Sequence, residues 1–494
     1  MRPSSTFSHT LDEIAEFLKI QAVAGEIRVT GVTSNSKDVR PGDLFVALPG
    51  ARVHGLDFAN QAIERGAVAI LSDRRISEQS IPILVVEDPR AHLGELASWF
   101  YGEPTRNLSV YGITGTNGKT TTTHLLFQIW QSVGISSGLI GTVGVQIGKE
   151  QFPAIHTTPE ADELQRTFAT MLEKGARFIA MEVSSHALVQ NRVSGTRFCA
   201  SGFTNLTQDH LDFHATMENY FQAKRLLFQR SLSDRAFITI DDDYGKRLAR
   251  EVASEFDIAP ISLTTSLSSA DWRYQSIDRL AAGYELVIAG PKNISISGRF
   301  NLVGEHNLQN LLLAVALASD SGVSAKEIEN AMSHLSGAPG RLEKVDCGQP
   351  FTVLVDYAHT PDAVDRVLRT VKSISTGRVI SILGCGGDRD KSKRPLMGAS
   401  LNIHSDIPIF TSDNPRSEDP QQIIDEMTSG LQLKTHAEII VDRKAAIAKA
   451  ISLAKPGDVV VVLGKGHESG QEIKGVKFPF SDQEVLREAL VGSK

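Results

Sequence analysis

Few cysteines, no excess of positive charge and no long apolar run are found in this sequence, and each absence excludes a class of protein. The three cysteines among 494 residues, Cys199, Cys347 and Cys385, are widely scattered and show no metal-type pairing. Their simplest interpretation is reduced thiols in a cytoplasmic protein. The formal net charge of −7 provides no global basic field for nucleic acid or anionic lipid. Any anionic substrate must therefore be bound by local clusters of Lys, Arg and backbone N–H groups.

Membrane insertion is not expected either. The longest aliphatic runs, such as 459–463, fall far short of the roughly 20 residues that cross a bilayer. The polar stretch from Met1 to Thr10 lacks the apolar core of a secretory signal. Apolar residues make up 41% and charged residues 22% of the chain, as in an ordinary globular protein. At about 150 residues per domain, the length predicts about three domains.

Alternating strand and helix patterns divide the chain into three segments, 1–108, 109–338 and 339–494. The first mixes short strands with helices, and its turn at 40–43 leads into a strand at 44–47. In the other two, apolar runs typical of buried strands alternate with amphipathic helices, which predicts parallel, doubly wound α/β sheets. Their strands are expected at 108–114, 178–183, 198–204, 351–355, 379–383, 407–411 and 459–463.

A glycine-rich stretch, GTNGKTT at 115–121, lies between an expected strand and an expected helix. In such a loop, backbone N–H groups approach phosphate oxygens, and the helix N-terminus adds a favourable dipole. Lys119 would reach the β- and γ-phosphates, and Thr120 would bind Mg²⁺. Ile113 stands where the usual pattern has glycine, so the loop is a variant. A purely structural Gly-Lys turn is the alternative, but the strand–loop–helix context and the two hydroxyls after the lysine favour a nucleotide site.

Further along the chain, Glu182, His210 and Lys224 are candidates for metal chemistry. Glu182 ends an expected strand, at the edge of an open α/β sheet where ligands bind. Carboxylate oxygens and an imidazole at such an edge suit Mg²⁺ bound together with a substrate phosphate. Taken alone, each residue has a structural alternative: a helix cap for Glu182, a turn for His210 and a solvated surface position for Lys224.

Together, five motifs spread along the chain resemble the Mur ligase family in sequence and in order. They are GTNGKTT at 115–121, EVSSH at 182–186, NL at 205–206, DHLD at 209–212 and AK at 223–224. The resemblance covers nearly the whole chain and implies an α/β fold of three domains. The first would be a small N-terminal α/β domain that binds the UDP substrate (1–108). The second would be a central P-loop-type domain with a doubly wound, mostly parallel sheet, which binds ATP and catalyses the reaction (109–338). The third would be a C-terminal Rossmann-like α/β domain that binds the amino acid (339–494).

The resemblance also implies a reaction. Joining a carboxylate and an amine in water is uphill, so ATP would first phosphorylate the carboxylate, and the amine would then attack the acyl phosphate. Lys119 and two Mg²⁺ ions would neutralise charge on the transferred phosphoryl group. The lysine that matches Lys224 is carbamylated in the family, which turns an amine into an anionic oxygen ligand for the second Mg²⁺.

Site residues are carried over from the same resemblance. Catalytic roles would fall to Lys119, Lys224, His210 and Glu182. The metal ligands would be Thr120, Glu182, His210 and Lys224 as its carbamate. ATP would contact Gly115, Thr116, Asn117, Gly118, Lys119, Thr120, Thr121, Asn307, Arg341, Asp356 and His359. ATP would thus bind at the boundary of the second and third segments, and closure of the third segment is our hypothesis for how water is excluded.

The first segment resembles the uridine-binding part of the family at 34–37, 41–47 and 50–55. Without the family, these stretches are only a turn, a strand and a loop. Arg192 would suit a carboxylate or a diphosphate, because its planar guanidinium binds such groups bidentately. The implied contacts with the UDP-linked muramoyl dipeptide are Ser34, Ser36, Thr157, Thr158, Ser184, Gln190 and Arg192.

An amino-acid pocket is expected where three strand ends of the third segment converge. The stretches 384–389, 413–416 and 464–468 each follow an expected strand. Asp-Asn-Pro favours a β-turn, which leaves Arg416 unexplained. In the family, Asp-Asn-Pro-Arg resembles the form that accepts meso-diaminopimelate, whose second carboxylate Arg416 would bind. The implied contacts are Arg389, Asp413, Asn414, Pro415, Arg416, Gly464 and Glu468.

Three alternatives remain open from the sequence. The same reaction with L-lysine would need a pocket without the arginine, and a folylpolyglutamate-type ligase shares the glycine-rich loop but not the first segment or the Asp-Asn-Pro-Arg stretch. A nucleotide-binding regulator without catalysis would not need Lys119, Glu182, His210 and Lys224 together. We expect a cytoplasmic monomer whose partners are ATP, the UDP-linked dipeptide and the amino acid, with Mg²⁺ as cofactor and without nucleic acid or membrane insertion.

Overall fold

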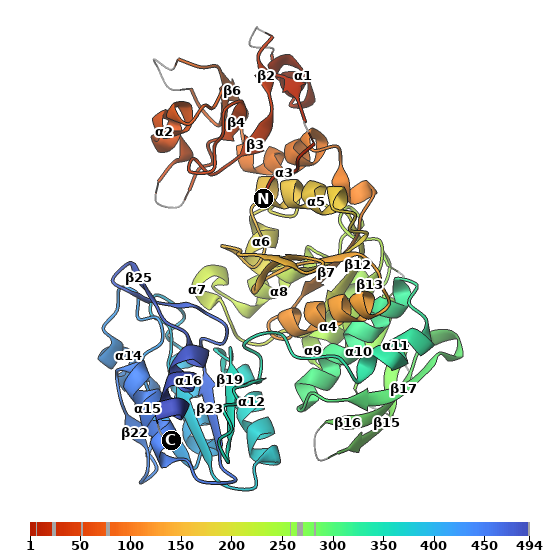
Figure 1. Cartoon of the computed structure of the whole chain (residues 1–494). Helices are drawn as coiled ribbons and strands as arrows, with labels where there is room; N and C mark the ends of the chain where they lie inside the picture. Colours follow the sequence, from red (N-terminus) through yellow and green to blue (C-terminus); the bar gives the residue numbers. More distant parts are fainter. Residues whose placement is uncertain are drawn as a thin grey trace.

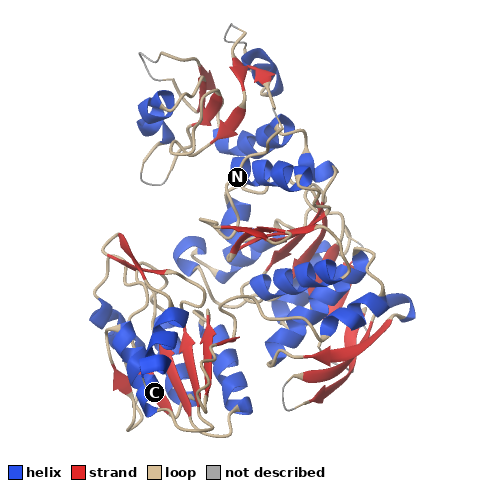
Figure 2. Ribbon diagram, viewed as in Figure 1, coloured by secondary structure: helices blue, strands red, loops and turns tan. Residues whose placement is uncertain are grey.

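The computed structural model describes residues 1–5, 7–21, 26–50, 53–75, 80–256, 258–263, 270–280 and 283–492. The chain forms three lobes in sequence order, each built around its own sheet (Figure 1). Helices cover the sheets of the central and C-terminal lobes (Figure 2). The sheets lie within 31–85, 109–300 and 343–463, so each falls inside one expected segment, and the boundaries between segments stay predictions. Residues 51 and 52, part of the expected uridine stretch 50–55, lie outside the described residues.

The N-terminal lobe has a small parallel sheet of three buried strands and one partly buried edge strand. In spatial order they are β3 (Gly31–Thr33), β4 (Asp43–Val46), β5 (Ala69–Ser72) and β6 (Ile83–Val85). Its helices are α1 (Leu11–Phe17), α2 (Ala59–Glu64) and α3 (Pro89–Phe100), and β1 (His9–Thr10) pairs with β2 (Arg28–Val29). The capping box of Thr10 and Glu13 fixes the start of α1. Helix α3 lies against α5 of the central lobe and joins the two lobes.

The central lobe holds an eleven-stranded sheet in the order β10-β9-β8-β11-β7-β12-β13-β14-β15-β16-β17. The strands are β7 (Ser109–Thr114), β8 (Ser137–Gly141), β9 (Gly144–Ile147), β10 (Glu150–Phe152), β11 (Phe178–Glu182), β12 (Phe198–Phe203), β13 (Ala236–Thr239), β14 (Ile258–Ser262), β15 (Trp272–Arg279), β16 (Tyr284–Ala289) and β17 (Ser295–Phe300). The helices are α4 (Lys119–Ser132), α5 (Ala161–Glu173), α6 (Ser185–Val189), α7 (Leu211–His214), α8 (Met217–Arg225), α9 (Asp243–Val252), α10 (Glu305–Asp320) and α11 (Ala325–Met332).

Strand direction in this sheet confirms the predicted doubly wound, mostly parallel architecture. The pairs from β8 to β15 are parallel, and antiparallel strands are added at both edges. Strand β7 lies between β11 and β12, and the chain leaves it towards β8 on one side before returning to β12 on the other. Ligands bind at such a switch point, outside the carboxyl ends of the strands. The carboxyl ends of β7, β11 and β12 therefore define the crevice.

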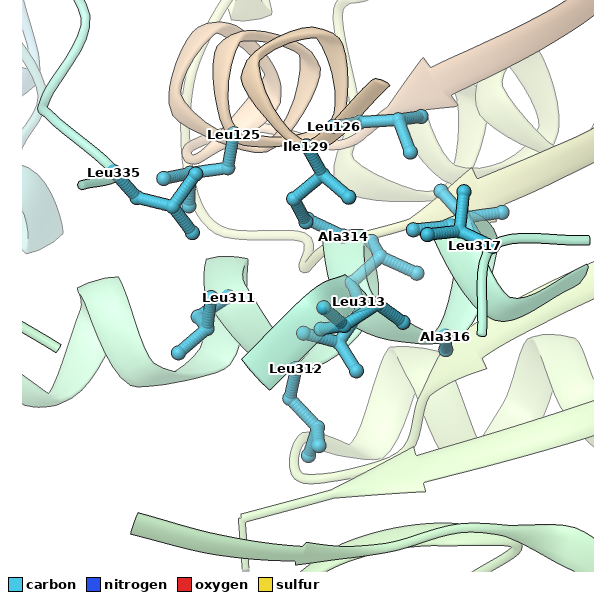
Figure 3. Packing of buried hydrophobic residues seen from close by; sticks show 14 of the residues in the cluster. Leu125, Leu126, Ile129, Leu311, Leu312, Leu313, Ala314, Ala316, Leu317 and Leu335 are labelled. Carbon is cyan, nitrogen blue, oxygen red and sulfur yellow. The ribbon is translucent and has the colours of Figure 1, made fainter. Parts of the chain in front are cut away.

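Packing of α4 on α10 anchors the helix that follows the glycine-rich loop. Leu125, Leu126 and Ile129 of α4 are fully buried and belong to one hydrophobic cluster with Leu311 and Ala314 of α10 (Figure 3). Burial of one such leucine or isoleucine side chain stabilises the fold by about 1.5–3 kcal/mol. The first residues of α4 are therefore held in a fixed position at the crevice.

The C-terminal lobe has a six-stranded sheet in the order β18-β19-β23-β20-β21-β22, parallel except for β18. The strands are β18 (Glu343–Lys344), β19 (Thr352–Asp356), β20 (Val379–Leu383), β21 (Ile407–Phe410), β22 (Glu438–Ile439) and β23 (Val459–Leu463). The helices are α12 (Pro361–Ile374), α13 (Lys393–His404), α14 (Pro420–Thr428), α15 (Arg443–Leu453) and α16 (Asp482–Gly492), and β24 (Gly470–Ile473) and β25 (Val476–Pro479) form a separate hairpin. In the described part of the chain, no helix combines the length and the apolar character that a bilayer crossing requires.

Candidate functional site

The glycine-rich loop follows β7 and wraps around the first turn of α4. Gly118 has φ +89°, and a Cβ there would lie 2.2 Å from Asn310 Oδ1. A Cβ on Gly115 would lie 1.8 Å from Thr204 Oγ1, so both positions require glycine. The Asn117 N–H donates to Asn205 Oδ1 at 3.0 Å, which ties the loop to the residues that follow β12.

Lys119, the first residue of α4, folds its side chain back over the loop. Its Nζ donates to the carbonyls of Gly115 at 2.8 Å and Thr116 at 3.0 Å. Burial, and then the positive charge of Arg341, lowers the pKa of Lys119. The ammonium group thus lies directly beside the loop whose backbone would bind phosphate.

Two hydroxyl groups surround the carboxylate of Glu182 at the end of β11. Thr120 Oγ1 donates to Glu182 Oε2 at 2.9 Å, and Thr142 Oγ1 donates to the same oxygen at 3.1 Å. The backbone N–H of Thr142 donates to Oε1 at 2.8 Å. A carboxylate and hydroxyl oxygens beside a phosphate loop are hard ligands that fit Mg²⁺. Thr142 follows β8, and a strand-end argument applied to that apolar run would have found it.

Lys224, near the C-terminus of α8, is almost fully buried with 1% of its surface exposed. Its Nζ donates to Gly115 O at 2.8 Å and lies 4.5 Å from the centre of the Tyr220 ring. Burial, and then the charge of Lys119, holds the pKa of Lys224 well below its ordinary value. An amine in this environment loses its proton more readily than an exposed lysine does.

His210 lies in a cluster of aromatic rings at the start of α7. Its Nε2 is 3.3 Å from Asp209 Oδ2, and its ring contacts His186 edge-on at 4.8 Å between centres. Burial lowers the pKa of His210 to about 3, although Asp209 opposes that shift. The imidazole is therefore neutral at physiological pH, as a metal ligand must be.

The four proposed metal ligands do not all touch one another. Thr120 and Glu182 are in direct contact, whereas Lys224 donates to Gly115 O and His210 Nε2 contacts Asp209 Oδ2. Among the residues that the structure describes, no three His, Cys, Asp or Glu side chains gather at a point that suits a metal ion. A second site would therefore depend on the carbamate of Lys224, which adds oxygens that a lysine does not have.

Asp209 links the crevice to the C-terminal lobe, and we did not predict this role. Its carboxylate lies 3.4 Å from Lys393 Nζ and 3.8 Å from His359 Nε2. Burial alone would raise the pKa of Asp209, but its interactions with His210, Lys393 and His359 hold it below its ordinary value. Lys393 is separated from Asp209 by 184 positions, so sequence reasoning had no local signal for the pair.

A pocket between the central and C-terminal lobes contains most of the residues expected to contact ATP. It is lined by Asn117, Gly118, Thr121, Asn205, His306, Asn307, Gln309, Asn310, Arg341, Leu342, Asp356, Ala363, Arg366 and Val367. Arg341 Nη2 donates to Thr120 Oγ1 at 3.3 Å, and its guanidinium lies 4.9 Å from the centre of the Tyr357 ring. The expected ATP residue His359 lines the neighbouring amino-acid pocket instead.

This pocket is bridged by a side-chain contact between the lobes. Asn117 Nδ2 of the loop donates to Asp362 Oδ2 of α12 at 3.1 Å. Arg366 Nε donates to Asp362 Oδ1 at 2.9 Å, and its Nη1 donates to Gln309 Oε1 of the central lobe at 3.1 Å. The loop is thereby held from both lobes.

The expected amino-acid residues converge in a second pocket at the carboxyl ends of the C-terminal strands. It is lined by Asp209, His210, Tyr357, His359, Gly384, Cys385, Gly386, Arg389, Lys393, Met397, Asp413, Asn414, Arg416, Gly464 and Glu468. Of the seven residues expected to contact the amino acid, Pro415 alone is absent from this lining. Asn414 Nδ2 donates to Glu468 Oε2 at 2.8 Å, and the buried Lys465 donates to the same oxygen at 2.9 Å. The pocket thus combines guanidinium groups with fixed carboxylates.

Of the residues expected to contact the muramoyl dipeptide, two lie in the N-terminal lobe and five lie in the central lobe. Thr158, Ser184 and Arg192 lie together near the carboxyl end of β11: Thr158 Oγ1 accepts from the Ser184 N–H at 3.0 Å, and Arg192 Nη1 donates to Thr158 O at 3.2 Å. Arg192 also pairs with Glu160 at 2.9 Å, so the expected anion clamp already has a carboxylate partner. The other four make these contacts: Thr157 with Thr142 at 3.1 Å, Gln190 through its carbonyl with Arg90 at 3.4 Å, Ser34 with Asp162 at 2.7 Å and Ser36 with Gln61 at 2.7 Å.

The glycine-rich loop lies at the switch point of a doubly wound sheet, beside hard oxygen ligands and a polar pocket at a lobe boundary. This combination defines a nucleotide-dependent enzyme of the P-loop type. Sequence models of the Mur ligase family match almost the whole chain: "Mur ligase family, catalytic domain" at 28–101, "Mur ligase middle domain" at 113–318 and "Mur ligase, glutamate ligase domain" at 340–466. The chain belongs to the Mur ligase family, as its motifs indicated.

Individual relatives are similar over their full lengths. The UDP-N-acetylmuramoyl-L-alanyl-D-glutamate--2,6-diaminopimelate ligase of Streptomyces coelicolor is 45% identical over 99% of this chain and 98% of its own. The enzyme of the same name from Aquifex aeolicus is 45% identical over 94% of each chain. A solved structure of a ligase with this name is 32% identical, with a TM-score of 0.68 and coverage of 98% of this chain and 99% of its own. The MurF structure from Acinetobacter baumannii, 19% identical with a TM-score of 0.68, shares the fold.

Proposed function

We propose that this protein is an ATP-dependent amide ligase in peptidoglycan precursor synthesis. It adds meso-diaminopimelate to the D-glutamyl carboxylate of UDP-N-acetylmuramoyl-L-alanyl-D-glutamate and forms ADP and phosphate. The observation that carries this proposal is the pocket in which Arg389 and Arg416 lie with Asp413 and Glu468, across the crevice from the phosphate loop. Two guanidinium and two carboxylate groups suit a ligand that has two ammonium and two carboxylate groups. The relatives at 45% identity carry the name of this activity.

The first step transfers the γ-phosphoryl group of ATP to the substrate carboxylate. The loop N–H groups and the dipole of α4 bind the phosphates, and Lys119 exchanges its loop carbonyls for phosphate oxygens. Thr120 and Glu182 are the residues that would hold Mg²⁺, which would supply positive charge to offset that of the phosphates. Asn307, Arg341 and Asp356 line the pocket for the nucleoside.

The burial of Lys224 and its lowered pKa are the features that support its carbamylation. The nitrogen lone pair attacks the carbon of CO₂, an N–C bond forms, and one proton is released to give an anionic carbamate. A lysine with an ordinary pKa is almost entirely protonated at neutral pH and reacts slowly, whereas Lys224 is buried beside Lys119 and its pKa is lowered. The new negative charge would also be attracted by the ammonium of Lys119.

In the second step, the neutral amino group of diaminopimelate attacks the acyl carbon. A C–N bond forms, the C–O bond to phosphate breaks, and the amine loses a proton. Water would compete for the same carbon, so the lobe boundary must exclude it. The contacts of Asn117 with Asp362 and of Asp209 with Lys393 support a closed arrangement at this boundary.

Phosphate release tests the proposal directly. The reaction contains ATP, Mg²⁺ and the UDP-linked dipeptide, with either meso-diaminopimelate or L-lysine. We expect strong release with diaminopimelate only. A preference for L-lysine would retain the ligase but overturn the assignment of the pocket. No release with either amino acid would favour a folylpolyglutamate-type or non-catalytic protein.

We further propose that the enzyme acts in the cytoplasm as a monomer with small-molecule partners. The sequence supports this by its scattered cysteines and its acidic balance, with a net charge of −7. ATP and the UDP-linked dipeptide are cytoplasmic metabolites, so the proposed reaction requires that compartment. Light scattering of the purified protein, with a mass near 53.6 kDa, would support the monomer.

A further inference from the structure

The hairpin β24–β25 is bonded along the Asp413–Arg416 stretch of the amino-acid pocket. Gln471 Nε2 donates to Asp413 O at 2.6 Å, and the Glu472 N–H donates to Asn414 Oδ1 at 2.9 Å. The Arg416 N–H donates to Glu472 O at 3.0 Å, and the Lys474 N–H donates to Arg416 O at 2.6 Å. Residue 416 therefore pairs with the hairpin like the residue of an added parallel strand.

The guanidinium of Arg416 is held from two directions. Nη1 donates to Gly387 O at 2.6 Å, and Nε lies 3.4 Å from Glu472 Oε2. A Cβ on Gly386 would come within 3.0 Å of Nη1, so the guanidinium lies close against the glycine turn. These contacts fix both the position and the plane of the group.

Arg416 lines the pocket, whereas Glu472 and Gly387 are not among the described residues that do. Glu472 therefore contacts the arginine from outside the ligand space. In the described part of the chain, Nη2 of Arg416 forms no hydrogen bond. Nη2 and the second hydrogen of Nη1 are thus available for end-on, bidentate binding of a ligand carboxylate.

We propose that Glu472 is a positioning residue for amino-acid specificity: its carboxylate holds Arg416 in the orientation that binds the distal carboxylate of the incoming amino acid. The inference rests on the proposed function, because it assigns a role within that pocket. It extends the amino-acid site to the hairpin, a part of the chain that the pocket lining does not include. Without Glu472, the guanidinium would keep one anchor, at Gly387 O, and would rotate about it.

The size of the effect follows from exposure. The Arg416 side chain is 22% exposed and that of Glu472 is 43% exposed, so water screens the pair. Removal of the negative charge should weaken binding of the distal carboxylate by about two- to fivefold. The effect should fall on KM for the amino acid, because the reacting amino group is at the other end of the molecule.

Steady-state kinetics of Glu472→Gln in the full-length protein test the proposal. We expect KM for meso-diaminopimelate to rise by about two- to fivefold, with kcat and KM for ATP near wild type. Glu472→Asp should recover part of the loss. A KM that falls would show that Glu472 competes with the substrate for Arg416, and an unchanged KM would show that it has no role; either result overturns the proposal.

A double-mutant cycle separates positioning from a general effect on folding. Once Arg416 is replaced by alanine, Glu472→Gln should cause no further rise in KM, whereas damage to the hairpin would add to it. Glu488→Gln is the matched control, since Glu488 pairs with Lys444 at 2.8 Å on the surface of the same lobe. If the wild-type enzyme uses diaminopimelate and the cycle shows no coupling, the inference alone fails. If the wild-type enzyme does not use diaminopimelate, both the inference and the proposed function fail.

Discussion

At the residue scale, the site depends on two lysines that share one carbonyl oxygen. Lys119 and Lys224 each donate to Gly115 O at 2.8 Å; Lys224 is buried, and Lys119 is half-buried. Two ammonium groups so close in a site of low polarity repel each other, which favours the loss of a proton from one of them. Burial and the charge of Lys119 hold the pKa of Lys224 well below its ordinary value, so this lysine is suited to react with CO₂.

Replacement of Lys224 by alanine should reduce kcat by about 100-fold or more, because the proposed anionic oxygen ligand is lost. Added short carboxylic acids should restore part of the activity by supplying oxygens in the vacated space. Phosphate release with and without formate or acetate measures both effects. Lys246→Ala serves as control, since Lys246 is an exposed lysine of α9 in the same lobe. Full activity of the Lys224 variant would remove its proposed role.

Replacement of Arg416 by alanine should lower kcat/KM for meso-diaminopimelate by about 30-fold or more, because a carboxylate in the pocket loses its charged partner. The activity with L-lysine should change little, so the ratio between the two amino acids falls. Arg487→Ala, at an exposed position of α16, is the control. An equal loss for both amino acids would mean that Arg416 supports the fold of the pocket and not the recognition of a second carboxylate.

At the scale of elements, the buried strands and the strand-end loops could be predicted, and the contacts between distant elements could not. The expected runs at 379–383 and 459–463 coincide with β20 and β23, because continuous apolar runs report burial on both faces of a sheet. The glycine-rich loop was found because its chemistry is local in the sequence. The hairpin β24–β25 was missed, since its strands have only four residues each and neither forms the continuous apolar run of a buried strand.

In the candidate site, too, the residues at strand ends could be predicted from the sequence, whereas the contacts between the lobes could not. Arg389, Asp413, Asn414 and Glu468 follow strands whose ends meet, so a single rule placed them in one pocket. Asp209 and its partner Lys393 come from different lobes, and nothing in the local sequence of either predicts their pairing. Such a pair depends on how the lobes pack, which periodicity and spacing do not specify.

His214, the last residue of the short helix α7, should make the stability of the protein sensitive to mild acid. Its Nε2 lies 2.9 Å from Ser185 Oγ, and its ring stacks on Tyr220. Burial, and then the charges of His186 and Lys224, lowers the pKa of His214 from 6.5 to about 4. Between these values the unfolded chain binds more protons than the folded protein, so stability is complete above pH 6.5 and falls as the pH drops towards 4.

Thermal unfolding at pH 7 and pH 5 tests this dependence. We expect Tm to fall between these values, and to fall less in His214→Gln, because that variant cannot take up the proton. Glutamine keeps a polar group near Ser185 and so limits the loss at pH 7. His436→Gln, an exposed histidine of the C-terminal lobe, is the control and should behave as the wild type. An identical fall in Tm for His214→Gln and the wild type would exclude His214 as the source.

At the scale of the whole molecule, the reaction requires two lobes to share one nucleotide pocket. Asn117 and Asn310 come from the central lobe, and Arg341, Asp356 and Arg366 come from the chain that enters and forms the C-terminal lobe. A ligand in this pocket therefore stabilises the closed arrangement, since neither lobe provides the complete set of contacts alone. The side-chain bridge from Asn117 to Asp362 is the contact through which this coupling is most directly measured.

Replacement of Asp362 by alanine should raise KM for ATP by about fivefold, the effect expected for loss of one charged hydrogen-bond partner between the lobes. The variant removes the acceptor of Asn117 Nδ2 and also frees Arg366, whose Nε pairs with the same carboxylate. Asp365→Ala is the matched control, because Asp365 lies on the same helix but pairs with His404 and Arg369 within the C-terminal lobe. Kinetics and small-angle scattering of both variants, with and without ATP, should show a larger radius of gyration for Asp362→Ala without ATP and recovery when ATP is bound. Equal behaviour of the two variants would mean that the bridge does not contribute to closure, and that the lobes are held by other contacts such as Asp209 with Lys393.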